Sequence, residues 1–296
     1  MEFIQQMING IALGSIYALL ALGYTMVYGI VKLINFAHGD VLMLGAFAGY
    51  FILTAMGVVS LPTLLLAFVV SMVSCALIGI FIERTCYKPL RNSPRITALI
   101  TAIGVSTLLE NGARVIPVMG PNPKQFPTFT NVNFDFFGIN ISMVQIVVLG
   151  VSIVLMITLN YIINGTKMGK SMKATSYDMD AAFLMGIDVN RVISFTFALG
   201  AALAAAGGIL FATAYPQVEP YMGMMPGLKA FVAAVLGGIG SIPGAMLGGF
   251  ILGTAETLTK GFISSKLADG VAFAILILIL VVKPSGILGM NSREKV

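Results

Sequence analysis

Apolar runs about twenty residues long recur along almost the whole chain, and they limit it to one class of fold. A helix needs about twenty apolar residues to cross the roughly 30 Å of hydrocarbon in a bilayer, and a lipid-exposed segment must satisfy its backbone hydrogen bonds internally. Hydrophobic residues make up 58% of the 296 residues and charged residues 10%, with a mean hydropathy of +0.97. Soluble domains carry about a quarter charged residues. The sequence therefore predicts an all-α polytopic membrane protein.

The runs predict a single transmembrane domain over residues 1–296 with about eight or nine membrane segments. The N-terminus lacks the basic region and cleavage site of a secretory signal, so the first run is expected to remain as a span. The expected segments lie near residues 8–31, 38–56, 61–82, 96–116, 141–163, 192–214, a broken stretch at 226–258, and 267–282.

The distribution of Lys and Arg predicts the orientation of these segments. The loops at 83–95 and 164–191 each carry four basic residues, whereas 117–140 holds only Lys124 and 215–228 holds none. Basic loops stay in the cytoplasm by the positive-inside rule. We therefore expect the N-terminus outside and the basic C-terminus in the cytoplasm.

This orientation requires the stretch at 226–258 to turn back within the membrane. The sequence GGIGSIPG at 237–244 interrupts it with Gly237, Gly238, Gly240 and Pro243. Irregular backbone at membrane depth is tolerated where protein or a cavity surrounds it. The sequence predicts a helical hairpin or a pair of half-helices here.

A second interruption, INFAHGD at 34–40, separates the first two segments. Four apolar segments precede the span at 141–163 and four follow it, starting from opposite faces of the membrane. This arrangement indicates an inverted-topology repeat with halves at about 8–118 and 192–282, whose broken helices usually surround a transport route.

Three polar residues, Asn35, His38 and Asp40, lie in the first interruption. The structural interpretation is that Asp40 caps a helix beginning at Val41, while Asn35 and His38 bond freed backbone groups. The same residues could line the pathway, and His38 with Asp40 could form a proton relay. The sequence leaves these readings open.

Other ionisable residues in the apolar segments have simple expected roles. Glu110 and Arg114 are four residues apart, which predicts an ion pair on one helix face. Lys229, Glu256 and Lys260 are expected at segment ends, where they can snorkel. No metal site and no catalytic set is predicted, because the single histidine and scattered carboxylates supply neither.

Small residues are spaced four apart in the second half, at Gly244/Gly248 and Gly249/Gly253. Such spacings let helix backbones approach closely in a membrane. We expect close packing within the bundle, with a moving subunit interface as the alternative.

The polar loop at 168–188 is expected to contain a short cytoplasmic helix that begins at the N-cap Asp178 and stops at Gly186. Its exposed part combines small and large apolar side chains and would fit a groove on a soluble partner. A helix lying on the membrane surface fits equally well. The residues expected in this helix are Asp178, Asp180, Ala181, Ala182, Phe183, Leu184, Met185 and Gly186.

Asp180-Ala181-Ala182, followed after three residues by Gly186, resembles the Glu-Ala-Ala-x-x-x-Gly coupling loop by which ABC importer permeases dock into their ATPases. The stretches at 34–50 and 231–253 resemble hallmarks of Liv-type branched-chain amino acid permeases. Related sugar permeases usually carry an Asp-Leu-Ser-Val-Gly type element at 35–40. Asp180 in place of Glu and Met179 in place of Pro depart from the pattern but keep the capping chemistry.

The resemblance implies a permease subunit of an ABC importer for Leu, Ile and Val in the bacterial cytoplasmic (inner) membrane. It implies a second, homologous permease subunit, two ABC ATPases and an extracytoplasmic solute-binding protein. ATP and Mg²⁺ would then be bound by the ATPases, and this chain, which lacks a phosphate-binding loop motif, would hold no cofactor. Nucleic-acid binding is not expected.

Two alternatives differ from this reading. Permeases for urea or short amides are similar in the Ala-His-Gly stretch at 37–39. An ion-coupled secondary transporter would also account for the inverted halves and for the pairing of His38 with Asp40.

Overall fold

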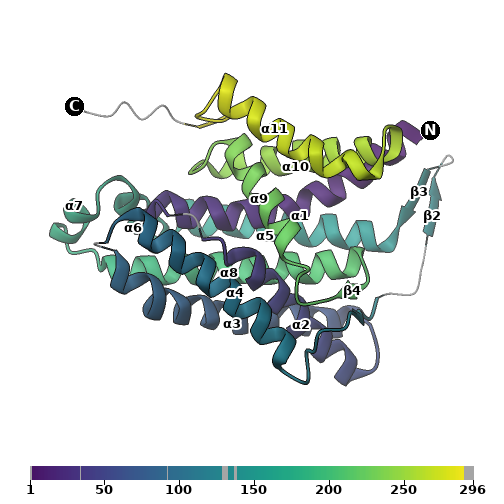
Figure 1. Ribbon diagram of the computed structural model, residues 1–296, viewed down its shortest axis with the longest axis horizontal. Helices are drawn as coiled ribbons and strands as arrows, with labels where there is room; N and C mark the ends of the chain where they lie inside the picture. Colours follow the sequence, from purple (N-terminus) through teal and green to yellow (C-terminus); the bar gives the residue numbers. More distant parts are fainter. Residues whose placement is uncertain (1, 34, 92, 129–132, 137–138, 290–296) are drawn as a thin grey trace.

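The described part of the chain is a bundle of long helices (Figure 1). The computed structural model describes residues 2–33, 35–91, 93–128, 133–136 and 139–289. The α-helices are α1 (Glu2–Val31), α2 (His38–Met56), α3 (Leu61–Ile82), α4 (Arg95–Val115), α5 (Met143–Gly165), α6 (Lys167–Tyr177), α7 (Met179–Leu184), α8 (Val189–Ala214), α9 (Met224–Gly237), α10 (Ile242–Phe262) and α11 (Ala268–Val282). Short turns are the π-helical η1 (Glu83–Tyr87) and the 3₁₀ turns η2 (Lys88–Leu90) and η3 (Ser265–Leu267).

Within the described residues, seven helices are long and apolar enough to cross a membrane. They are α1, α2, α3 with its continuation to Leu90, α4, α5, α8, and η3 with α11. The predicted broken stretch is two antiparallel helices, α9 and α10, that form a hairpin. The count of eight or nine segments is reached only if this hairpin is included, so the count itself stays a prediction.

Helix α1 is the central axis of the bundle. It runs the length of the molecule between α10 and α11 on one side and α8, α2 and α3 on the other (Figure 1). From Gly10 to Val27 it is buried at every position except Ile11. Since it is covered on all sides by protein, its sequence is apolar all round rather than striped.

Glycines let α10 approach two helices at once. A Cβ on Gly253 would lie 2.3 Å from the Cα of Gly14 in α1, and a Cβ on Gly248 would lie 2.0 Å from the Ala233 carbonyl oxygen in α9. Gly249 also faces α1, and Gly244 also faces α9. The two predicted small-residue spacings therefore serve two different helix contacts, both inside this chain, as expected for close packing within the bundle.

Helices α2, α3 and α8 form the other layer. A Cβ on Gly45 of α2 would lie 2.3 Å from the Cα of Ala205 in α8, and one on Gly79 of α3 would lie 2.7 Å from the Ala201 side chain. The opposite face of α3 exposes Val69, Val73, Leu77 and Phe81. A buried small-residue face and an exposed apolar face are what a lipid-facing helix requires.

Four short strands lie at the end of the bundle opposite α7, and the all-helical prediction omitted them. The strands are β1 (Lys124–Gln125), β2 (Asn133–Phe136), β3 (Ile139–Ser142) and β4 (Gln217–Val218). β1 pairs antiparallel with β4, so that Lys124 lies opposite Val218, and β2 pairs antiparallel with β3. We call the two ends of the bundle the α7 end and the strand end (Figure 1).

Candidate functional site

The segment between α5 and α8 protrudes at the α7 end as two helices, α6 and α7 (Figure 1). The sequence predicted α7 but missed α6, which begins where the Thr166 hydroxyl accepts a hydrogen bond from the Gly169 amide at 3.1 Å. The predicted N-cap of α7 is present: Asp178 Oδ1 accepts hydrogen bonds from the amides of Asp180 and Ala181, both at 2.9 Å. Two amides that no helical carbonyl can reach are thereby satisfied.

Gly186 ends α7 in the left-handed conformation, with φ +84° and open space around it. Its amide donates to the Phe183 carbonyl at 2.9 Å, and the Ile187 amide donates to the Ala182 carbonyl at 3.1 Å. This is the Schellman arrangement, which pairs the last free carbonyls of a helix. The predicted stop at Gly186 is therefore a backbone requirement.

The α7 helix presents one apolar surface to solvent, which we call the α7 tip: Phe183, Leu184 and Met185, at 69%, 83% and 83% exposed. Ala182 was expected in this exposed part, but it is only 4% exposed because it faces back toward the body of the protein. A cluster of large exposed apolar side chains outside the membrane-spanning helices is a candidate contact surface.

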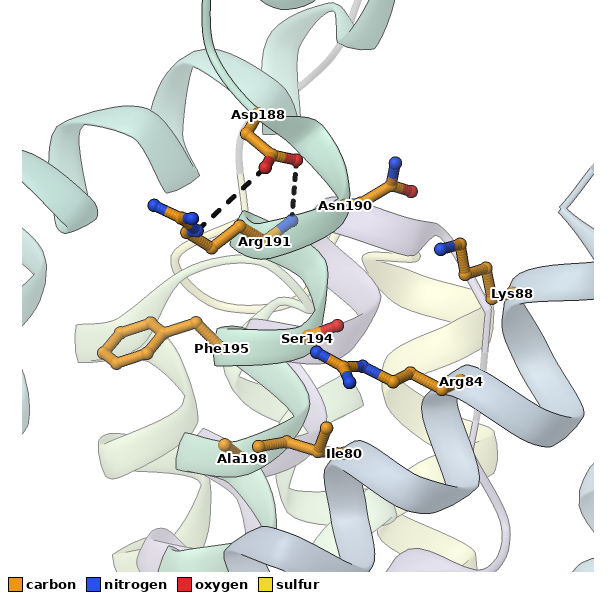
Figure 2. Close-up of a pocket in the computed structure, with 9 residues that line it drawn as sticks. All are labelled: Ile80, Arg84, Lys88, Asp188, Asn190, Arg191, Ser194, Phe195 and Ala198. Atoms are coloured by element: carbon orange, nitrogen blue, oxygen red, sulfur yellow. Dashed lines mark hydrogen bonds and ion pairs between the residues drawn. The ribbon is translucent and has the colours of Figure 1, made fainter.

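Asp188 connects the α7 tip to α8. Its Oδ1 accepts a hydrogen bond from the Arg191 amide at 3.1 Å and so caps α8, while its Oδ2 lies 4.0 Å from Nε of Arg191 (Figure 2). Only Ile187 separates the stop of α7 from this cap. Helices α7 and α8 are therefore directly linked, and α8 packs on α1, α2 and α3.

In the first interruption, the side chain that bonds the backbone before α2 is Asn35 and not Asp40. Asn35 Oδ1 accepts hydrogen bonds from the Ala37 amide at 3.1 Å and from the Tyr87 hydroxyl at 2.8 Å. Helix α2 begins at His38, so Asp40 lies in its first turn and does not cap it. The prediction of an Asp40 cap was wrong because the helix starts three residues before Val41.

His38 and Asp40 are 3% and 2% exposed. The His38 ring lies against Tyr24, with ring centroids 4.5 Å apart. His38 Nε2 and Asp40 Oδ2 have no hydrogen-bond partner among the described residues. Both side chains are therefore packed inside the bundle, and they do not line an open channel in this conformation.

Helix α2 begins deep in the bundle, where it meets the beginning of α9. A Cβ on Gly39 would lie 2.6 Å from the Gly223 carbonyl oxygen, and one on Gly227 would lie 2.8 Å from the Cα of Gly39. The His38 ring contacts Gly23, eight residues or about 12 Å before the end of α1. The partner of the first interruption is thus the segment leading to Gly223, and not the one at 237–244.

The interruption at 237–244 is the turn of the α9–α10 hairpin. Gly238 and Gly240 have φ of +105° and +96°, and the Ser241 amide donates to the Gly238 carbonyl at 3.0 Å. Ser241 caps α10, and Pro243 occupies the first turn, where it removes no helical hydrogen bond. A Cβ on Gly237 would lie 2.0 Å from the Gly244 carbonyl oxygen.

The segment after α11 closes the hairpin turn. The amides of Ile287 and Leu288 donate to the carbonyls of Leu236 and Gly237, both at 2.9 Å. These two carbonyls are the last in α9, so no amide within that helix donates a hydrogen bond to them. The end of the described chain is therefore bonded to the hairpin.

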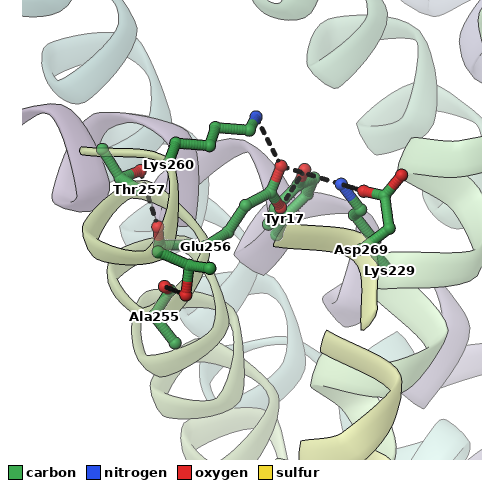
Figure 3. Close-up of polar contacts among 9 residues, drawn as sticks. Tyr17, Lys229, Ala255, Glu256, Thr257, Lys260 and Asp269 are labelled. Carbon is green, nitrogen blue, oxygen red and sulfur yellow. Dashed lines mark hydrogen bonds and ion pairs between the residues drawn. The ribbon is translucent and has the colours of Figure 1, made fainter. Parts of the chain in front are cut away.

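A buried ionic cluster joins α1, α9, α10 and α11 (Figure 3). Glu256 accepts hydrogen bonds from Lys229 and Lys260, each at 2.7 Å, and from the Tyr17 hydroxyl at 2.9 Å. Lys229 also lies 2.6 Å from Asp269. Glu256 is 2% and Lys229 5% exposed, so the prediction that they snorkel was wrong. Their burial is tolerated because each charge has an opposite partner.

The predicted pair of Glu110 and Arg114 is also absent from the described residues. Arg114 Nη1 donates instead to the Tyr221 hydroxyl at 2.7 Å, and its guanidinium lies 5.4 Å from the centre of that ring. Tyr221 precedes α9, so the contact joins α4 to the second half of the chain. Sequence spacing alone identifies the possible pair but not this competing partner.

Beside the ionic cluster, toward the strand end, lies a cavity of about 470 Å³. Its wall includes the polar side chains of Gln6, Asn9, Gln145, Thr257 and Lys260. The side-chain amide of Gln145 donates a hydrogen bond to Asn9 Oδ1 at 2.5 Å. The Lys260 side chain, which donates to the buried Glu256, is also part of this wall. A polar recess next to paired charges can accommodate a small polar solute or water.

Comparison with known proteins gives consistent matches over nearly the full length. The family model described as branched-chain amino acid transport system / permease component matches residues 6–280. The permease protein LivH of the Escherichia coli K12 high-affinity branched-chain amino acid transport system is 46% identical, with 99% of this chain and 98% of that protein covered. BraD of Pseudomonas aeruginosa, from a system of the same description, is 43% identical, with 100% and 98% covered.

Among solved structures, PsaBC from Streptococcus pneumoniae in complex with Fab has a TM-score of 0.49 and 14% identity, covering 96% of this chain and 93% of that chain. The family match and the two relatives agree with a helical bundle whose described residues include seven helices able to span a membrane. The chain belongs to the permease component family of branched-chain amino acid transport systems: it is a membrane permease subunit and not an enzyme.

Proposed function

We propose that this chain is a transmembrane subunit of an ABC importer that carries Leu, Ile and Val across the cytoplasmic membrane. The observation that carries the proposal is the α7 tip, a capped, solvent-exposed apolar surface on a chain of this permease family. ATP is hydrolysed in partner ATPases, and the α7 tip docks into a groove on one of them. An amphipathic helix set into an apolar groove is a common mode of recognition.

The assembly contains two ATPases, a second homologous permease subunit and an extracytoplasmic binding protein. The N-terminus lies outside and the α7 end in the cytoplasm, which follows from the basic loops next to η1 and α6. The halves at 8–118 and 192–282 form an inverted repeat. Support for the repeat comes from the two helices, α2 and α9, that begin inside the bundle and touch there.

Closure of the ATPases would push α7 and, through the Asp188 cap, move α8. Helix α8 packs against α2 and α3, and α2 meets α9 at the Gly39 and Gly223 contact. The force from the ATPases would thereby reach the place where the starts of α2 and α9 meet. Movement of these helices against the α1–α10 core would alternate access to the two sides of the membrane.

The substrate assignment rests on the relatives and on the apolar character of the bundle. An apolar route suits aliphatic side chains, and recognition of the charged amino and carboxylate groups would fall mainly to the binding protein. The family does not by itself separate these substrates from urea or short amides, so the test must compare them.

The decisive experiment reconstitutes the complete transporter with Phe183→Asp/Leu184→Asp in this chain. Both side chains are exposed, so the variant should fold and assemble with the second permease subunit normally. Uptake of leucine and substrate-stimulated ATPase activity should fall at least about tenfold, because two charges would enter an apolar groove. Val58→Asp, an exposed apolar residue at the opposite end, is the matched control.

Full uptake by the Phe183/Leu184 variant would contradict the docking role of α7. Uptake of urea in preference to leucine by the wild-type complex would reassign the substrate. Solute flux by this chain alone in ATP-free proteoliposomes under an ion gradient would favour a secondary transporter instead.

A further inference from the structure

A second open site lies at the α7 end, between α8 and the segment where α3 continues into η1. It is a recess of about 550 Å³. We call it the basic recess. The lining residues that bear on its chemistry are Ile80, Arg84, Lys88, Asp188, Arg191 and Ala198 (Figure 2).

Charge is unbalanced in the basic recess. It contains three cations, Arg84, Lys88 and Arg191, and one carboxylate, Asp188. Asp188 lies 4.0 Å from Arg191. In the described part of the chain, Arg84 and Lys88 have neither a hydrogen-bond acceptor nor an ion-pair partner for their side chains. The recess therefore carries an excess positive charge that the described residues do not neutralise.

A buried ion pair next to the recess holds η1 against α8. Glu83, fully buried, is paired with Arg91 and accepts a hydrogen bond from the Ser194 hydroxyl at 2.7 Å. Arg91 Nη1 also donates to Asn190 Oδ1 at 2.6 Å. Glu83 and Arg91 are paired with each other and join η1 to α8, whereas Arg84 in the π-helical turn η1 and Lys88 at the start of η2 are exposed. Such turns are often found at functional sites.

The recess is amphipathic along the bundle axis. Figure 2 shows the charged groups of Asp188, Arg191 and Lys88 toward one end and the apolar Ile80 and Ala198 toward the other. Beyond Ile80, the outer face of α3 exposes Leu77 and Phe81, at 63% and 65%. The polar end thus lies where basic loops meet the membrane surface, and the apolar end continues into the lipid-facing side of α3.

We propose that the basic recess binds the phosphate of an anionic phospholipid, with Arg84 and Lys88 at the headgroup, Arg191 at the rim on the other side of α8, and the acyl chains on Ile80 and the outer face of α3. Guanidinium and ammonium groups bind phosphate through charge-assisted hydrogen bonds. Basic pockets between membrane helices at this level bind lipid headgroups in the same way. The apolar end favours a lipid over a free phosphate ester.

A lipid bound here would bridge η1 and the first turn of α8. Arg191 is three residues from Asp188, which joins α7 to α8. The lipid would therefore hold the start of α8 against α3. Binding itself does not depend on the transport function proposed above and can be measured without it.

The test is lipid binding by the purified full-length chain in its native complex, measured by native mass spectrometry with added phosphatidylglycerol or phosphatidylcholine. Wild type should bind phosphatidylglycerol preferentially. Arg84→Gln/Lys88→Gln should weaken this binding about ten- to thirtyfold, since each cation near an anionic headgroup contributes about a factor of five. Arg84→Lys/Lys88→Arg, which keeps both charges, should retain most of the affinity.

The control variant is Lys32→Gln/Lys170→Gln, which removes two exposed cations outside the recess. It should leave phosphatidylglycerol binding within about twofold. If the double variant of Arg84 and Lys88 does not fold, Lys88→Gln alone should still weaken binding about fivefold.

Three outcomes of the binding measurements would overturn the proposal. They are unchanged binding in the recess variants, equal weakening in the control variant, and displacement of phosphatidylglycerol by millimolar glycerol 3-phosphate, which would indicate a site for a soluble phosphate. A photoreactive residue introduced at Ala198 offers a further test. Cross-linking of another protein subunit of the complex at this position, in place of lipid, would also overturn the proposal.

Discussion

Helix α7 and the α9–α10 hairpin both appear in the sequence as glycine-containing interruptions, yet glycine is required in them for different physical reasons. Gly186 adopts φ +84°, and a Cβ added there would have no neighbouring atom within 4 Å, so only the backbone conformation requires glycine at this position. Gly248 has an ordinary helical backbone, but a Cβ would lie 2.0 Å from the Ala233 carbonyl oxygen. A substitution at the exposed Gly186 should therefore cost little free energy, whereas one at the packed Gly248 should cost much more.

The two regions also treat charge and apolar surface in opposite ways. The α7 tip exposes its large apolar side chains, and the Asp residues around it are exposed. The hairpin buries Lys229 and Glu256 and packs against α1 and α11. We infer that α7 is built to be contacted by another protein and that the hairpin is built to hold its shape. Substitutions should therefore separate loss of coupling from loss of folding.

The largest effect is expected for Gly248→Leu. The added side chain would meet the α9 backbone, which cannot move without opening the hairpin, so the loss should exceed about 4 kcal/mol. Little folded protein should be recovered by size-exclusion chromatography in detergent. Gly104→Leu, in α4 with open space around it, is the control and should fold normally. A folded Gly248→Leu protein would show that the hairpin is less tightly packed than described.

The next effect is expected for Lys229→Met, which leaves Asp269 and part of Glu256 without a partner. Breaking a buried ion pair costs about 3–5 kcal/mol. The thermal unfolding midpoint in detergent should fall accordingly, while Lys266→Met, an exposed lysine in η3, should leave it nearly unchanged. In Lys229→Met/Glu256→Gln the combined loss should be smaller than the sum of the single losses, because the residues interact directly. Additive losses would contradict the cluster.

A smaller and more local effect is expected for Gly186→Ala. A left-handed backbone costs a residue with a Cβ about 1–2 kcal/mol, confined here to the end of α7. Leucine uptake should fall by up to about tenfold while the unfolding midpoint of the chain stays within error. Gly186→Asn should lose less, because Asn tolerates this conformation better. Equal losses for Ala and Asn would mean that space and not φ limits this position.

The smallest effect is expected for Asp178→Ala, which removes the acceptor for two amides at the start of α7. Loss of an N-cap costs about 1 kcal/mol. Hydrogen exchange of amides 179–184 should accelerate about fivefold, and Asp178→Ser should restore most of the protection. Unchanged exchange in Asp178→Ala would show that packing on α8, and not the cap, maintains α7.

Local features of the fold could be predicted because they depend on neighbouring residues. The spans at 38–56 and 61–82 match α2 and α3 at both ends, and the cap at Asp178, the stop at Gly186 and the hairpin at 237–244 are present. Each follows from apolar length or from the special chemistry of Asp, Gly or Pro. The strands were missed because two to four residues give too short a pattern for sequence periodicity.

Contacts between distant segments could not be predicted. The sequence placed Lys229 and Glu256 near segment ends, but α9 begins inside the bundle, so both are buried. Likewise, Arg114 is bonded to Tyr221, 107 residues away, rather than to Glu110. A polar residue within an apolar run signals a buried partner, but only the packing of the helices identifies which residue it is.

The bonds from Ile287 and Leu288 to the last carbonyls of α9 set a practical limit on how the C-terminal end can be altered. A chain shortened to Gly286 would leave the Leu236 and Gly237 carbonyls without donors at the hairpin turn. Affinity tags and fluorescent reporters should therefore be attached beyond Leu288, and a protease site introduced before Ile287 would release the turn on cleavage.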